Sequence, residues 1–94
     1  MLRARFQEDM KTALRNKEGV RLSAIRMILA ELKLKDIEAR PAGNTEGAPD
    51  SAILSMLEGM VKKRQGSIAM YRQGNRPELE QKEGEENAVL QSYI

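Results

Sequence analysis

The sequence predicts an all-α protein that folds as an irregular bundle of four helices. Apolar residues recur three or four positions apart in successive segments, which is the spacing of one face of a helix. Short joints rich in Gly, Asn and Pro separate these segments, with one longer loop at residues 40–50. The 94 residues fit one small domain, and no internal repeat or domain boundary interrupts them. We therefore expect a single helical domain over residues 1–94.

The first two helices follow from their apolar spacing. The first is predicted over about residues 2–16, from Leu2, Phe6, Met10, Ala13 and Leu14. The second, over about residues 18–39, is the most apolar segment and has two apolar sides. One side carries Leu22, Ile25, Ile28, Leu29 and Leu32, and the other carries Val20, Met27 and Leu34. A helix that is apolar on two sides lies between neighbours, so we expect it at the centre of the domain.

The third helix is predicted over about residues 51–73. Asp50 is positioned to cap its N-terminus, and Gly74 and Asn75 end it with residues that tolerate a left-handed backbone. Pro77 then opens a fourth helix, whose first turn is acidic as the helix dipole favours. Its apolar stripe is thin: Leu79, Ala88, Val89, Leu90, Tyr93 and Ile94.

The composition excludes several kinds of chemistry. Cysteine and histidine are absent, so the chain has no disulfide, no thiol nucleophile, no Cys/His metal site and no histidine general base. Neither of the Gly-rich phosphate-binding motifs is present, and the serines have no histidine to activate them. Glu83 and Glu86 could form a weak cation site, but a solvated helix face is the favoured interpretation. We expect no catalytic residue, no metal and no cofactor.

No apolar run reaches the roughly 18 residues of a membrane span. The first segment, MLRARFQEDMKTAL, is too charged for a secretory signal peptide. We therefore expect no membrane partner, and a cytoplasmic, bacterial protein.

Charge is segregated along the chain, although the net charge is only +2. Residues 51–76 carry five Lys and Arg against one acidic residue, and residues 77–94 carry one against five. A basic surface beside an acidic helix suits an anionic partner. The alternative, favoured on composition alone, is that the acidic helix neutralises its basic neighbours within the fold.

Lys62, Lys63 and Arg64 cannot share a helix face, because consecutive helical residues lie about 100° apart. Arg64 falls in the middle of the apolar stripe of its helix. We therefore predict that Arg64 is a structural residue at the edge of the core and that its guanidinium binds a carboxylate. Asp36 is one candidate for that carboxylate. Lys62 and Lys63 should point outward.

Gly59 and Gly66 lie on the outer side of the same helix, beside these two lysines. Each glycine in a helix interior costs about 1 kcal/mol relative to alanine, so the pair could serve close approach by another helix or by a phosphate backbone. Neutral variation on a solvent face explains them equally well. Aromatic residues are few, so any nucleic acid would be structured RNA or a duplex held by its backbone.

Two stretches resemble the GatB/YqeY family: RLSAIRMILAELKLKDIEAR and, after the loop, VKKRQGSIAMYRQGNRPELEQKEGEENAVLQSYI. The motifs that carry the resemblance are R-L-S-x-I-R at Arg21, Leu22, Ser23, Ile25 and Arg26, V-K-K-R-x-x-S-I at Val61 to Arg64, Ser67 and Ile68, and G-x-R at Gly74 and Arg76. The resemblance implies an N-terminal four-helix bundle followed by a C-terminal three-helix bundle. Family members continue beyond the position of Ile94, so we expect an isolated N-terminal domain or a truncated product that lacks the second bundle.

The resemblance also implies a function. In the glutamine-dependent amidotransferase that converts mischarged Glu-tRNA or Asp-tRNA to the amide form, the similar region is the tail of the B subunit, which helps recognise tRNA. It thus implies a noncatalytic accessory module that binds tRNA or assists tRNA-dependent amidation, a carbon–nitrogen ligase reaction with glutamine as nitrogen donor. On this hypothesis Lys62, Lys63, Arg72 and Arg76 bind phosphates. Arg64 and Arg26 are then structural.

A second hypothesis is a protein-interaction module. Gly59, Gly66 and the acidic last helix would dock a partner helix or the C-terminal domain. Direct amidotransferase activity is the least favoured hypothesis, because the chemistry of that enzyme resides in other domains and subunits.

Overall fold

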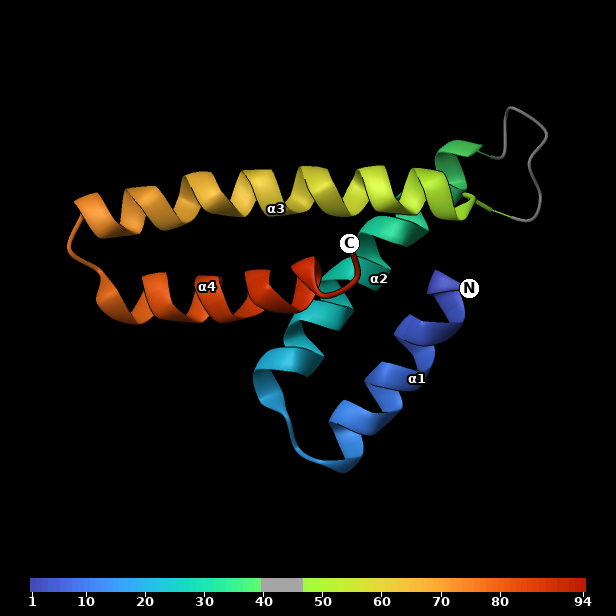
Figure 1. Ribbon diagram of the computed structural model, residues 1–94, viewed down its shortest axis with the longest axis horizontal. Coiled ribbons are helices and arrows are strands. Elements are labelled where there is room, and N and C mark those ends of the chain that lie inside the picture. The colour runs from blue at the N-terminus through green and yellow to red at the C-terminus, as the bar shows by residue number, and fades with distance from the viewer. Residues whose placement is uncertain (40–46) are drawn as a thin grey trace.

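A computed structural model describes residues 1–39 and 47–94 (Figure 1). These residues form four helices: α1, Leu2–Arg15; α2, Gly19–Ala39; α3, Asp50–Gln73; and α4, Pro77–Gln91. The all-α prediction is confirmed, and the first three helices begin and end within one residue of their expected bounds. Most of the predicted loop at 40–50 lies outside the described residues. None of the four helices, as far as they are described, has the length and apolar character needed to cross a bilayer.

The start of α3 differs from expectation. Pro49 occupies its N-cap position without a side-chain cap, and Asp50 is the first helical residue, so the prediction that Asp50 caps the helix is wrong. The Asp50 carboxylate faces α1 instead. It accepts a hydrogen bond from the Leu2 amide at 3.4 Å and lies 3.7 Å from the N-terminal amino group of Met1. Asp50 therefore ties the start of α3 to the start of α1.

The core lies where α1, α2, α3 and the end of α4 meet. Its most deeply buried large side chains are Phe6, Ile25, Ile28, Ile53, Leu57 and Leu90. The Phe6 ring also packs edge-on against Tyr93, with the ring centroids 4.9 Å apart, a contact worth about 1 kcal/mol beyond its buried area. The Tyr93 hydroxyl donates a hydrogen bond to Asp9, and Arg5 lies 4.8 Å above the Tyr93 ring. These contacts fix the end of the chain against α1.

The central helix α2 packs against α1, α3 and α4, as expected. Its first apolar side is buried, notably at Ile28 and Leu32. On the second side, Val20 and Leu34 are 36% and 54% exposed, and Met27 is partly buried. The expectation that neighbours cover both sides is therefore wrong for the described residues, because no described helix packs over the side that carries Leu34.

Helices α3 and α4 form a long antiparallel hairpin. At the joint, Asn75 adopts a left-handed backbone with φ of 57°, a conformation that asparagine tolerates better than most residues. Pro77 then opens α4. The turn end of the hairpin extends past α1 and α2 (Figure 1), and no residue from Lys62 to Glu85 is fully buried. The molecule is consequently elongated, with extents of 47 × 30 × 18 Å.

Candidate functional site

An ion cluster joins α2, α3 and α4. The Arg64 guanidinium of α3 contacts two α4 carboxylates, that of Glu83 and that of Glu86, the latter through Nη1 and Oε1 at 3.2 Å. From α2, Ser23 Oγ donates to Glu86 Oε2 at 2.7 Å, and Met27 Sδ lies 2.7 Å from Arg64 Nη2. The side chains of Arg64 and Glu86 are only 13% and 5% exposed, so burying either charge without the other would cost free energy. We call these five residues the Arg64 cluster.

Arg64 points inward, but its partner is not Asp36. The Asp36 carboxylate accepts hydrogen bonds from Arg3 Nη1 and Nη2 at 2.8 and 2.6 Å and from the Ala48 amide at 2.9 Å. The hydrogen bond from Arg3 to Asp36 raises the pKa of Arg3 above its ordinary value. Asp36 cannot also reach Arg64, because Arg64 meets α2 at Met27, nine residues or about 14 Å back along the helix.

The interpretation of Glu83 and Glu86 as a solvated helix face is wrong. Arg64 holds both carboxylates, and Glu86 is buried. The reason lies in the hairpin, since residues equally far from the turn lie opposite each other on two antiparallel helices. Arg64 and Glu86 are each eleven positions from Asn75. This equal distance from the turn predicts the contact between Arg64 and Glu86 from the sequence. The prediction is missed when each helix is considered separately.

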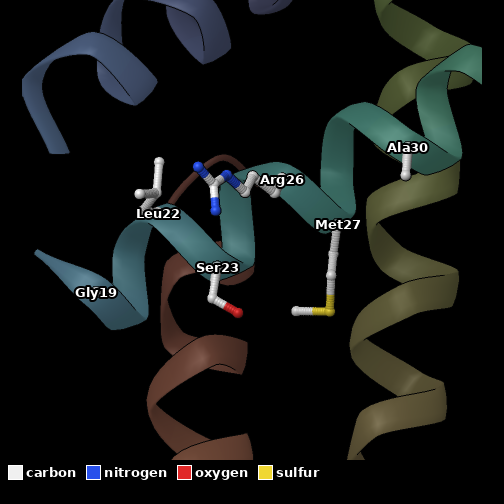
Figure 2. A pocket seen from close by; sticks show the side chains of 6 residues that line it. All are labelled: Gly19, Leu22, Ser23, Arg26, Met27 and Ala30. Carbon is white, nitrogen blue, oxygen red and sulfur yellow. The ribbon is translucent and has the colours of Figure 1, made fainter. Parts of the chain in front are cut away.

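A shallow groove runs along α2 beside the cluster, and we call it the α2–α3 groove. It begins at an open hollow of about 470 Å³ lined by Gly19, Leu22, Ser23, Arg26, Met27 and Ala30 (Figure 2). It continues past Lys63, Arg64 and Ser67 of α3 and ends near Lys35 and Gly59. The groove thus brings residues of the motifs R-L-S-x-I-R and V-K-K-R-x-x-S-I to one surface.

The residues of the first motif point in different directions. Figure 2 shows Ser23 and Met27 pointing the same way, while the Arg26 side chain runs alongside the α2 ribbon toward Leu22. Arg26 is exposed and makes no hydrogen bond or ion pair with residues 1–39 or 47–94. No contact therefore supports the structural role expected of Arg26. Three other residues of this motif make contacts within the fold: Arg21 pairs with Asp9 of α1 at 3.5 Å, Ser23 bonds Glu86, and Ile25 is buried.

The four cations predicted to bind phosphate are all exposed, but they do not form one patch. Lys63 lines the α2–α3 groove, while Lys62 lies on another side of α3, beside the last residues of the chain. Arg72 and Arg76 lie at the turn end of the hairpin, where Arg72 Nε is 3.0 Å from Glu80. The structure therefore separates two lysines at the middle of α3 from Arg72, about 14 Å further along the helix, and from Arg76, which lies beyond its end.

Gly59 and Gly66 lie exposed on α3 between the directions of Lys62 and Lys63. A Cβ atom added at either position would meet no atom within 4 Å. No described helix of this chain therefore uses them for close packing. We call this surface the glycine face; any close partner there must come from outside the described residues.

In the Arg64 cluster one guanidinium serves two carboxylates, those of Glu83 and Glu86. Burial, and then the hydrogen bond to Asp9, raises the pKa of Tyr93 to about 12, so the Tyr93 hydroxyl stays protonated at neutral pH. Within residues 1–39 and 47–94, no group of three acidic side chains is placed to hold a metal ion.

Comparison with known proteins points to one family. A model of the family described as Yqey-like protein matches residues 3–94. Three fungal relatives are each named altered inheritance of mitochondria protein 41, mitochondrial. They are 35% identical over 89 residues in Pyrenophora tritici-repentis, 27% over 89 in Vanderwaltozyma polyspora and 26% over 90 in Kluyveromyces lactis. The matches cover at least 95% of this chain and 46% of each relative, so the chain spans about half the length of the curated relatives it matches.

These relatives overturn the expectation of a cytoplasmic protein, because their names call them mitochondrial. That expectation used the charge of the first segment, which argues against a secretory signal but says nothing about other compartments. The relatives are fungal, and they lend no support to the expected bacterial origin.

Proposed function

This chain belongs to the YqeY-like protein family, and from that premise we propose that it is a noncatalytic module that binds structured RNA, tRNA foremost. In this proposal it assists tRNA-dependent amidation and supplies no catalytic group to it. The names of the fungal relatives support a mitochondrial setting for that role.

The glycine face is the observation that carries the proposal. Lys62 and Lys63 flank it, and neither makes an ion pair with a described residue, so both charges are available to phosphates. Because an added Cβ at Gly59 or Gly66 meets nothing within 4 Å, a phosphate backbone can approach the α3 backbone closely between the lysines.

The turn end of the hairpin supplies a second group of cations. Arg76 has no ion-pair partner among the described residues. Arg72 pairs with Glu80, but its side chain is 73% exposed, and such a surface pair is weak enough to be exchanged for a phosphate. The two groups are about 14 Å apart along α3, a distance that spans several phosphates of a duplex.

A titration of the chain with a tRNA transcript at about 50 and 200 mM salt tests the proposal. Four phosphate contacts should weaken binding by roughly 50- to 150-fold over that range. The variant Lys62→Gln/Lys63→Gln should lower the slope of log Kd against log salt by about 1.5. Lys11→Gln/Lys82→Gln is a matched control, since it removes two exposed charges from α1 and α4. The proposal would be refuted if the chain did not bind tRNA at the lower salt concentration, or if its affinity for tRNA did not change with salt.

The glycine face also favours a second candidate function, the docking of a partner helix. A pull-down with this chain as bait, with and without nuclease, separates the two. Nuclease should release proteins that are held through RNA and should retain a protein that docks directly. The variant Gly59→Leu/Gly66→Leu should lose a directly docked protein while keeping its helicity, because both positions are open in this structure.

A further inference from the structure

The outer side of α2 carries an apolar stripe that the described helices leave largely uncovered, although Met27 at its start contacts Arg64 of α3. Leu34 and Ile37 are 54% and 45% exposed, Ala30 is exposed, and Met27 is partly buried. These four residues are spaced by three, four and three positions, which is the pattern of the a and d positions of a heptad repeat. They lie roughly opposite the buried Ile28 on the same helix.

The charges that flank this stripe are sorted by sign. Arg26 and Lys33, seven residues apart, occupy the g positions on one side, and Glu31 and Glu38 occupy the e positions on the other. All four are exposed. Three of them make no ion pair with described residues, and Glu38 has only a surface contact with Lys35 at 3.6 Å, which is weak.

This charge pattern complements itself in one orientation. When two such helices pack in parallel, each g residue faces the e residue five positions later in the other helix. Arg26 would then face Glu31 of a second copy, and Lys33 would face its Glu38, which with their symmetry mates makes four attractive contacts. Antiparallel packing would instead place cations against cations and carboxylates against carboxylates.

We propose that α2 is a dimerisation helix that packs in parallel against α2 of a second copy of this chain. The small side chain of Ala30 lets the two helices approach closely, and the open hollow along the first half of α2 leaves room beside them. The stripe is only about two heptads long, so the dimer is weak and dissociates on dilution. Lys62 lies on another side of α3, but Glu31 lines the α2–α3 groove together with Gly59 and Lys63, so the dimer surface adjoins one edge of the glycine face.

Sedimentation velocity of the full chain over a range of concentrations at low salt tests the proposal. The wild type should pass from monomer to dimer as its concentration rises. Two charge-swapped variants, Glu31→Lys/Glu38→Lys and Arg26→Glu/Lys33→Glu, should each associate roughly a hundredfold more weakly, because four attractive contacts become repulsive. An equimolar mixture of the two should regain the dimer, since opposite charges again face each other.

Matched controls carry the same changes of net charge at exposed positions on other helices. They are Glu58→Lys/Glu85→Lys and Arg15→Glu/Lys82→Glu. Both should dimerise like the wild type. Loss of association in the controls as well would overturn the assigned surface, because net charge alone would then explain the result.

The apolar stripe gives a second readout that does not depend on charge. Leu34→Ala/Ile37→Ala should abolish the dimer and leave far-ultraviolet circular dichroism unchanged, since both side chains are largely exposed in the monomer. A wild type that stays monomeric at its highest attainable concentration overturns the proposal. So does a charge-swapped mixture that stays monomeric, or a dimer that survives these alanine substitutions.

Discussion

Replacing Arg64 with methionine tests the Arg64 cluster directly. Methionine keeps an apolar stem but leaves Glu83 and Glu86 adjacent without a cation. Removing one partner of a buried ion pair costs about 3–5 kcal/mol. Glu83 is 24% exposed, so water screens part of the remaining charge and we expect the lower end, about 3 kcal/mol. That is a large share of the roughly 5–14 kcal/mol expected of a domain of this size.

Urea denaturation followed by far-ultraviolet circular dichroism measures the loss. With a slope of about 1 kcal/mol per molar urea, the midpoint should fall by about 3 M. Arg72→Met is the matched control, because Arg72 is also on α3 and pairs with an α4 glutamate, but its side chain is 73% exposed. The control should lose less than about 1 kcal/mol. Equal losses in the two variants would refute the reasoning that burial makes the difference.

Four other substitutions test separate parts of the structure. Gly59→Ala and Gly66→Ala should each raise the free energy of unfolding in urea by about 1 kcal/mol, because both positions are helical and open; a loss would mean that the glycine face is packed. The pKa of Tyr93 is raised from 10.0 to about 12, so the stability that its neutral hydroxyl contributes is complete below pH 10 and is lost as pH rises through 12. Between about pH 8 and 11, the free energy of unfolding of Tyr93→Phe should therefore fall less than that of the wild type. An equal fall in the two proteins would contradict this explanation. Asp36→Ala should cost about 1–3 kcal/mol, because the Ala48 amide loses its acceptor and Arg3 keeps only the Ala48 carbonyl; an unchanged thermal midpoint would argue against this.

The helices were predictable because each depends on local spacing. Apolar residues every third or fourth position and the Gly, Asn and Pro joints are properties of short segments, and they gave three helices nearly to the residue. The inward direction of Arg64 followed from the same periodicity. Its partner did not, because Asp36 and Glu86 are both carboxylates on helices, and only the register of the hairpin decides between them.

The candidate site was less predictable, because it depends on which helices meet. The angle between Lys62 and Lys63 showed that they face different ways, but only the packing of α2 on the hairpin places Lys63 in the α2–α3 groove. The pattern of α2 likewise showed two apolar sides. It could not show that the side carrying Leu34 stays open among the described residues.

The turn end of the α3–α4 hairpin is two helices thick, and no third element among the described residues buries it (Figure 1). Segments with so few buried contacts open locally at low free energy, so their amide hydrogens exchange faster than those of the core. Arg72 and Arg76 are in this segment, and a ligand that binds them must also order it. Binding there would be seen mainly as slower amide exchange at the hairpin turn, with little change around Lys62, where α3 is already anchored by the core.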